Sequence, residues 1–183
     1  SYNGENMNEK LCLGVGPLPV NKQHLQIIDS TWILIDLYVD DPAIIKMDAR
    51  HLEYPDNSVS KIYTSHLLEH FELKEILPTL KEWYRVLQPG GELIVSVPDL
   101  EWALGELIRL ENNEKAISAV YTTSKMMMEV IYGNQVHEGE FHKSGFTGNS
   151  LKKYLSDSGF KDISMKSMFE AHDMCCLFGK AIK

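Results

Sequence analysis

The chain has 183 residues, 44% hydrophobic and 24% charged, an ordinary balance for one globular domain. Its formal net charge is -8 and it has no dense basic run, which argues against a surface built to grip nucleic-acid phosphates. No apolar run is long enough to cross a bilayer, and residues 1–10 lack the apolar stretch of a signal peptide. We therefore expect a cytoplasmic protein that binds a small molecule. We expect it to bind neither nucleic acid nor a membrane.

The three cysteines are Cys12, Cys175 and Cys176. The odd count and the adjacent pair argue against a disulfide framework and favour reduced, cytoplasmic thiols. Residues 1–9 are predicted as a flexible tail and residues 10–183 as a single domain. The sequence leaves open the oligomeric state, with a homodimer among the options, and whether the domain belongs to a longer chain.

Short apolar runs alternate with longer helical patterns, which is typical of βαβ units and a mostly parallel sheet. Strands are predicted at residues 10–14, 31–37, 44–47, 61–65 and 92–97, and a final pair at 161–169 and 174–181. Helices are predicted at residues 73–87, 100–110, 116–131 and 149–158, with a turn at 88–91 and a loop at 133–147. The expected fold is α/β, with helices on both faces of the sheet and a C-terminal antiparallel strand hairpin.

Gly14 and Gly16 follow the first predicted strand, within the sequence LGVG. Glycine lets the backbone turn tightly and approach a ligand, and such a turn faces the ligand at the carboxyl edge of the sheet. No third glycine completes a GxGxxG pattern, because Pro17 and Pro19 follow. This departure counts against a nicotinamide-dependent oxidoreductase, which only the two glycines and a later acidic residue favour.

Two acidic residues follow the next two strands. Asp36 lies about 20 positions past the glycine turn, where a carboxylate accepts hydrogen bonds from a ribose diol. It can also be a loop-capping residue beside Asp40 and Asp41. Asp48 follows the short third strand, where a carboxylate can accept from an exocyclic amine such as that of adenine. Asp48 also suits a helix N-cap, and the two roles are compatible.

The sequence SHLLEH, residues 65–70, places polar groups after the fourth predicted strand. Glu69 and His70 can take or hold protons there, although His70 can equally pack against a loop. His142 lies in a polar, glycine-flanked loop, and an unshifted imidazole can accept a proton from a substrate hydroxyl. We expect His142 or His70 to be a general base. The histidine spacing matches no metal-site signature, so no metal is expected.

The motifs LGVG, Asp36, MDA, SHLLEH and VLQPGGELIVSVPD, in this order, resemble those of class I S-adenosylmethionine-dependent methyltransferases. The resemblance spans residues 10–99 and implies a Rossmann-like sheet, with S-adenosylmethionine as cofactor and S-adenosylhomocysteine as product. The family pattern assigns a role to each matching position: Gly14 and Gly16 cradle the methionine part, Asp36 holds the ribose, Asp48 with Ala49 meets the adenine, and Ser65 and His66 lie beside the sulfonium.

The second half, with Tyr132-Gly133, FHKSGFT and LKKYLSDSGF, resembles a subgroup of predicted methyltransferases linked to cell-surface glycan pathways. This resemblance implies a loop over the active site and an acceptor that is a small molecule or a sugar hydroxyl. His142, His70 and Glu69 are then the catalytic candidates. The segment Pro17-Leu18-Pro19, which stands where the family has its later glycine, motivates an alternative: a degenerate, non-catalytic binding or scaffolding domain.

Overall fold

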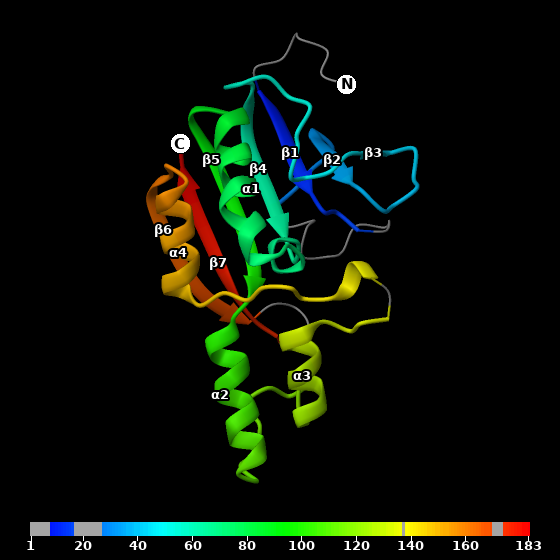
Figure 1. Ribbon diagram of the computed structural model, residues 1–183, viewed down its shortest axis with the longest axis vertical. Coiled ribbons are helices and arrows are strands. Elements are labelled where there is room, and N and C mark those ends of the chain that lie inside the picture. Colours follow the sequence, from blue (N-terminus) through cyan, green and yellow to red (C-terminus); the bar gives the residue numbers. More distant parts are fainter. Residues whose placement is uncertain (1–7, 17–26, 137, 170–173) are drawn as a thin grey trace.

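The computed structural model describes residues 8–16, 27–136, 138–169 and 174–183. A seven-stranded sheet runs through the molecule in the order β3-β2-β1-β4-β5-β7-β6 (Figure 1). β7 pairs antiparallel with both β5 and β6, whereas all other neighbouring strands are parallel. The predicted mostly parallel sheet with a C-terminal antiparallel hairpin is confirmed.

The described strands are β1 (Glu9–Leu13), β2 (Trp32–Asp36), β3 (Ile44–Lys46), β4 (Val59–Ser65), β5 (Leu87–Pro98), β6 (Lys161–Phe169) and β7 (Cys175–Ile182). β5 differs most from the prediction, because residues 88–91 belong to the strand rather than to a turn before it. Gly90, at φ +80°, allows this irregular stretch, and its N–H donates to the carbonyl of Lys183 at 3.1 Å.

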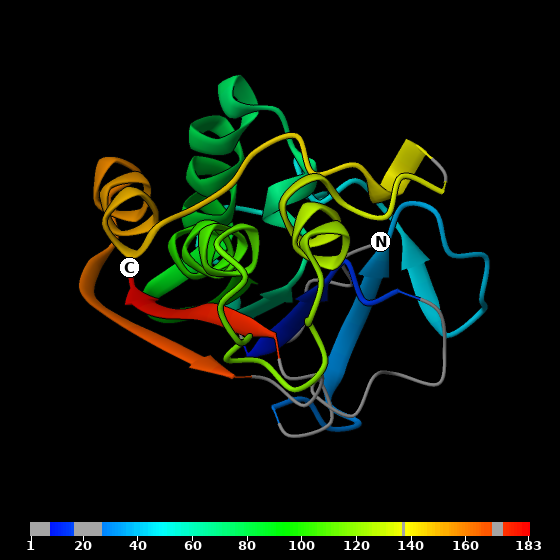
Figure 2. The same cartoon turned by 90° about the horizontal axis from the view of Figure 1, so that it is seen from below.

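Four α-helices are described: α1 (Leu73–Val86), α2 (Leu100–Glu111), α3 (Ser124–Tyr132) and α4 (Gly148–Asp157). Two 3₁₀ turns, η2 (Leu68–His70) and η3 (Glu138–Glu140), lie in the connections. α1 and α4 lie on the same face of the sheet, while α2 and α3 extend beyond the carboxyl end of β5 (Figures 1 and 2). Among the described helices, none combines the length and the apolarity that spanning a bilayer requires.

The helix predicted at residues 116–131 begins only at Ser124. Thr123 caps it, with its side chain accepting a hydrogen bond from the backbone N–H of Met126. The preceding residues are held in another conformation by the buried carboxylate of Glu106, which accepts from the backbone N–H groups of Ile117 and Ser118. Helical periodicity alone could not reveal this side-chain competition.

The main core lies between the sheet and the α1–α4 layer, with Trp83, Leu80 and Ile62 fully buried. The Trp83 indole N–H donates to the carbonyl of Ala49 at 2.7 Å, which fixes the chain just after β3 against α1. A second apolar cluster, which includes Trp32, covers the opposite face of the sheet. Apolar packing on both faces thus fixes the strands, and the polar loops that follow the parallel strands meet at the carboxyl edge of the sheet.

Candidate functional site

The glycine turn after β1 closes against the end of β2. Gly14 and Gly16 have φ angles of +67° and +70°, a region that side chains rarely adopt. The N–H of Gly14 donates to the carbonyl of Ile35 at 2.9 Å, and that of Gly16 to Oδ2 of Asp36 at 3.0 Å. The two sequence motifs therefore meet in one place.

The Asp36 carboxylate organises both sides of this turn. Its Oδ1 accepts from the backbone N–H groups of Tyr38 at 2.8 Å and Val39 at 3.1 Å, in addition to the bond from Gly16. A carboxylate offers about four lone-pair sites, so three bonds leave room for one more donor. Asp36 is therefore both the loop cap and an acceptor that faces the cavity beyond it.

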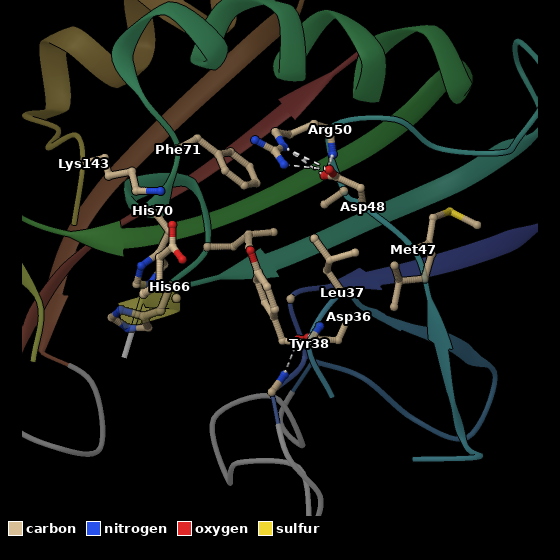
Figure 3. Close-up of a pocket in the computed structure, with 17 residues that line it drawn as sticks. Asp36, Leu37, Tyr38, Met47, Asp48, Arg50, His66, His70, Phe71 and Lys143 are labelled. Carbon is tan, nitrogen blue, oxygen red and sulfur yellow. Dashed lines mark hydrogen bonds and ion pairs between the residues drawn. The ribbon is translucent and has the colours of Figure 1, made fainter. Parts of the chain in front are cut away.

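Asp48, after β3, is tied to Arg50, a residue that the sequence reasoning missed. The guanidinium Nη2 lies 2.7 Å from Oδ2 of Asp48, and Nη1 lies 2.8 Å from Oε1 of Glu75 on α1. The hydrogen bond from Arg50 holds the pKa of the Asp48 carboxyl below its usual range. In the sequence, this pair was signalled by an arginine two positions after the aspartate. Figure 3 shows the two side chains facing each other.

A cavity of about 220 Å³ lies over these strand ends. Its lining includes the predicted cofactor residues Gly14, Gly16, Asp36, Asp48, Ala49 and His66, together with His70. Ser65 does not line it: its side chain is 3% exposed, and its hydroxyl has no hydrogen-bond partner among the described residues. Glu69 is also absent from this lining.

Glu69 instead lies at the centre of a group of histidines. Its side chain is buried, and His66 Nδ1 lies 3.3 Å from its Oε1. Glu69, His70 and His142 each offer a ligand atom within 4.8 Å of the others. The rings of His70 and His142 meet edge to face, with centroids 4.9 Å apart. The three predicted catalytic residues therefore come together.

Two backbone carbonyls set the tautomers of these histidines. Nδ1 of His70 lies 3.1 Å from the carbonyl oxygen of Phe141, and Nδ1 of His142 lies 2.9 Å from that of Val130. A carbonyl oxygen only accepts, so Nδ1 must carry the proton in both rings. In the neutral imidazole, Nε2 then has a free lone pair.

Burial and mutual proximity set the charges in this group. Desolvation by burial lowers the pKa of His142, an effect that the nearby Glu69 carboxylate opposes and His70 reinforces. Burial raises the pKa of Glu69, but His66, His70 and His142 outweigh that effect and hold it below its usual range. Near neutral pH the group therefore contains a carboxylate beside a neutral His142.

Backbone hydrogen bonds bring His142 to this position. The N–H groups of Lys143 and Ser144 donate to the carbonyl of Glu69 at 2.8 and 3.0 Å, and that of His142 donates to Tyr132 at 3.0 Å. The loop 141–146 is thereby fastened to the 3₁₀ turn η2. It continues to Phe146, whose carbonyl accepts from Leu100 at the start of α2.

A second cavity, of about 460 Å³, adjoins the first. It is lined by three histidines and Met174 with residues of the 120–140 segment, among them Glu129 and Glu140; the histidines are His66, His70 and His142. His66 and His70 line both cavities. The histidine group is therefore the shared wall between the cavity over the strand ends and the second cavity.

Comparison with protein families matches residues 32–95 to a model described as a methyltransferase domain. This range runs from β2 into β5 and includes Asp36, Asp48 and the SHLLEH sequence. It leaves the glycine turn and the second half of the chain outside. No curated protein matches the sequence significantly.

Several solved structures share the fold. A SAM-dependent methyltransferase from Archaeoglobus fulgidus has a TM-score of 0.63 at 15% identity, over 96% of this chain and 86% of that one. The 1,6-didemethyltoxoflavin-N1-methyltransferase of Burkholderia thailandensis, with bound 1,6-didemethyltoxoflavin and S-adenosylhomocysteine, has a TM-score of 0.62 at 14% identity, over 95% of this chain and 70% of that one.

Phosphoethanolamine N-methyltransferase 2 of Haemonchus contortus, in complex with S-adenosyl-L-methionine, has a TM-score of 0.60 at 12% identity. The match covers 99% of this chain and 50% of that protein, so this chain spans about half its length. These likenesses show a Rossmann-like sheet of the class I methyltransferase type, as the sequence predicted. None of the named structures indicates the expected link to glycan pathways, which stays a prediction.

Proposed function

We propose that the protein is an S-adenosylmethionine-dependent methyltransferase whose acceptor is a hydroxyl of a small molecule or a sugar. The observation that carries the proposal is the shared wall: His66 and His70 separate the cavity over the strand ends from a second cavity. A group-transfer enzyme needs two such adjoining spaces, one for donor and one for acceptor.

The residues of the first cavity fit the cofactor. The space around the Cα of Gly16 is open, with no heavy atom within 4 Å of where a Cβ would lie. Asp36 keeps one acceptor site for a ribose hydroxyl, and Asp48 with Arg50 supplies polar groups for an adenine. The neighbouring structures crystallised with S-adenosylmethionine or S-adenosylhomocysteine support this assignment.

When bound, S-adenosylmethionine supplies a methyl group on a positively charged sulfur. The protein's own task is then mainly alignment, and removal of a proton where the acceptor is a hydroxyl. In the absence of any bound cation, Nε2 of His142 accepts that proton, since its Nδ1 is held by Val130. Glu69, buried beside the ring, stabilises the imidazolium that results.

Calorimetric titration with S-adenosylhomocysteine tests the cofactor site. We expect micromolar binding to the intact chain and loss of at least tenfold in affinity for Asp36→Ala, since a hydrogen bond to a charged group contributes about 1.5–3 kcal/mol. Asp40→Ala, which removes a nearby exposed carboxylate, is the matched control. Absence of binding to the intact chain contradicts the proposal.

An acceptor screen that starts with sugars tests the transfer itself. We expect turnover to fall far more in the double variant His70→Ala/His142→Ala than its affinity for S-adenosylhomocysteine does, since only His70 lines the first cavity. Turnover that survives in this variant excludes both histidines as bases. Binding without turnover on any acceptor favours the degenerate scaffold, whose motivating segment at residues 17–19 lies outside the described residues.

A further inference from the structure

We propose that Glu69, His70 and His142 form a binding site for one divalent transition-metal ion at the wall of the second cavity. Their ligand atoms lie within 4.8 Å of one another, and the residues come from η2 and from the loop that is fastened to it. This goes beyond the sequence analysis, which expected no metal, because only the fold brings His142 to the other two.

The ligand set suits such a cation. Two imidazoles with one carboxylate bind zinc in hydrolytic enzymes and ferrous iron in oxygenases, whereas Mg²⁺ and Ca²⁺ prefer oxygen ligands. In a tetrahedral site with metal–ligand bonds of about 2.0–2.2 Å, neighbouring ligand atoms lie about 3.5 Å apart. The ligand atoms, now within 4.8 Å of one another, therefore need side-chain rotations that bring them roughly 1 Å closer.

The histidines are already oriented as metal ligands. A ligating histidine almost always donates its other ring N–H to a carbonyl or a carboxylate, which fixes the tautomer and the direction of the ring. Here Phe141 and Val130 accept from Nδ1 of His70 and His142, at 3.1 and 2.9 Å. Both Nε2 lone pairs are consequently available to a cation.

The Glu69 carboxylate is the second, independent observation. Its side chain is 1% exposed, His66 Nδ1 at 3.3 Å from Oε1 is its one close polar partner, and Oε2 accepts no hydrogen bond among the described residues. Burial of a carboxylate whose second oxygen has no partner is costly, and a coordinated cation compensates for that cost directly.

The site is accessible from the second cavity. His70 and His142 line this cavity together with Glu129 and Glu140, and Glu129 is paired with Lys125 at 3.7 Å. Three protein ligands leave at least one coordination position open, as in catalytic rather than structural zinc sites. This part of the inference rests on the proposed function: the open position binds the acceptor oxygen and makes its hydroxyl more acidic.

Titration of the chelator-treated full chain with Zn²⁺ tests the site, with Co²⁺ absorption as a spectroscopic report of the ligands. We expect one equivalent of Zn²⁺ per chain and little response to Mg²⁺. His142→Asn and Glu69→Gln should weaken Zn²⁺ binding by about a hundredfold or more, since even the outer partners of ligands contribute 10–100-fold. Asparagine keeps a donor for the Val130 carbonyl, so the loop need not unfold.

His51→Asn, which removes an exposed histidine elsewhere, should bind Zn²⁺ like the intact chain. No binding of Zn²⁺ or Co²⁺, or binding that His142→Asn leaves unchanged in a folded protein, overturns the site. S-adenosylhomocysteine titrations on the same samples keep the two proposals separate. Zn²⁺ binding without cofactor binding contradicts only the methyltransferase proposal, and the reverse contradicts only the metal site.

Discussion

The imidazole of His142 lies edge to face against that of His70, with ring centroids 4.9 Å apart, and both rings lie beside the buried carboxylate of Glu69. The loop that carries His142 reaches this place because the backbone N–H groups of Lys143 and Ser144 bind the carbonyl of Glu69. The protonation of each group therefore depends on the others, and this dependence has measurable consequences.

The free energy of unfolding should fall as the pH drops below the pKa of an ordinary histidine. Desolvation lowers the pKa of His142 in the folded chain from the usual 6.5, so between these two values the unfolded chain binds more protons. The contribution of neutral His142 is fully present above pH 6.5 and is lost as the pH falls toward the folded-state pKa. Urea midpoints of the chelator-treated chain, measured from about pH 5 to about pH 8, should show this slope.

His142→Gln should reduce the dependence of the urea midpoint on pH, whereas His51→Gln, at an exposed position, should leave it unchanged. The carboxylate of Glu69 does not confuse the result, because its pKa lies below 4.5 and its own contribution is lost only in more acidic solution. Equal slopes in the intact chain and in His142→Gln would show that another group titrates in this range.

Gly133→Ala should destabilise the chain and disrupt the second cavity. Gly133 has φ +79° and ψ 169°, a region that is essentially restricted to glycine and that costs other residues about 1–3 kcal/mol. A Cβ at this position also meets the carbonyl oxygen of Glu140 well inside van der Waals contact. Thermal or urea unfolding should show a loss of at least about 2 kcal/mol, since strain and clash act together.

Gly105→Ala provides the control. Gly105 lies within α2, and no heavy atom is within 4 Å of the place where its Cβ would lie, so alanine should stabilise the helix by about 0.5–1 kcal/mol. If the two variants unfolded alike, the backbone strain assigned to Gly133 would be wrong.

The half of the site nearest the strand ends could be predicted from the sequence. Hydrophobic runs define β1, β2 and β3, and parallel strands bring the residues that follow them to one edge, so Gly14, Gly16, Asp36 and Asp48 had to converge. The family resemblance added their roles. The hydrogen bond from Gly16 to Asp36 joins two of these motifs directly, a contact that the sequence analysis did not specify.

The other half could not be predicted in the same way. His142 reaches Glu69 through backbone hydrogen bonds between distant segments, which leave no periodic signal. Arg50 was missed because an arginine two positions after an aspartate is common on any surface. The start of α3 was misplaced because the buried Glu106 binds the backbone of the preceding residues. In each case a long-range side-chain or loop contact overrides a local pattern.

Arg50→Gln should weaken both the fold and the cofactor site. The guanidinium joins Asp48 to Glu75, with side chains that are each less than one third exposed, so we expect a loss of about 1 kcal/mol in unfolding free energy. Loss of the hydrogen bond should also raise the pKa of Asp48, and affinity for S-adenosylhomocysteine should fall several-fold.

Lys74→Gln is the control for Arg50, because it removes an exposed ion pair with Glu72 and should change stability by less than about 0.5 kcal/mol. Urea unfolding and calorimetry on both variants measure the two effects. An Arg50 variant that unfolds and binds like Lys74→Gln would show that Asp48 needs no support from the guanidinium.

Gly16→Ala and Gly90→Ala together separate backbone strain from loss of binding. Both glycines have positive φ, at +70° and +80°, and neither has a heavy atom within 4 Å of the place where a Cβ would lie. Each substitution should therefore cost a similar 1–2 kcal/mol or so of stability. Only Gly16 lines the first cavity, where its new methyl group would occupy ligand space.

We therefore expect equal shifts in the urea midpoint and a selective loss of S-adenosylhomocysteine affinity, of about tenfold or more, in Gly16→Ala. The Gly90 variant corrects for any effect of lower stability on the calorimetric signal, since it carries the same strain in β5, away from that cavity. Equal affinities in the two variants would mean that the ligand does not approach the glycine turn, and the cofactor would have to bind elsewhere.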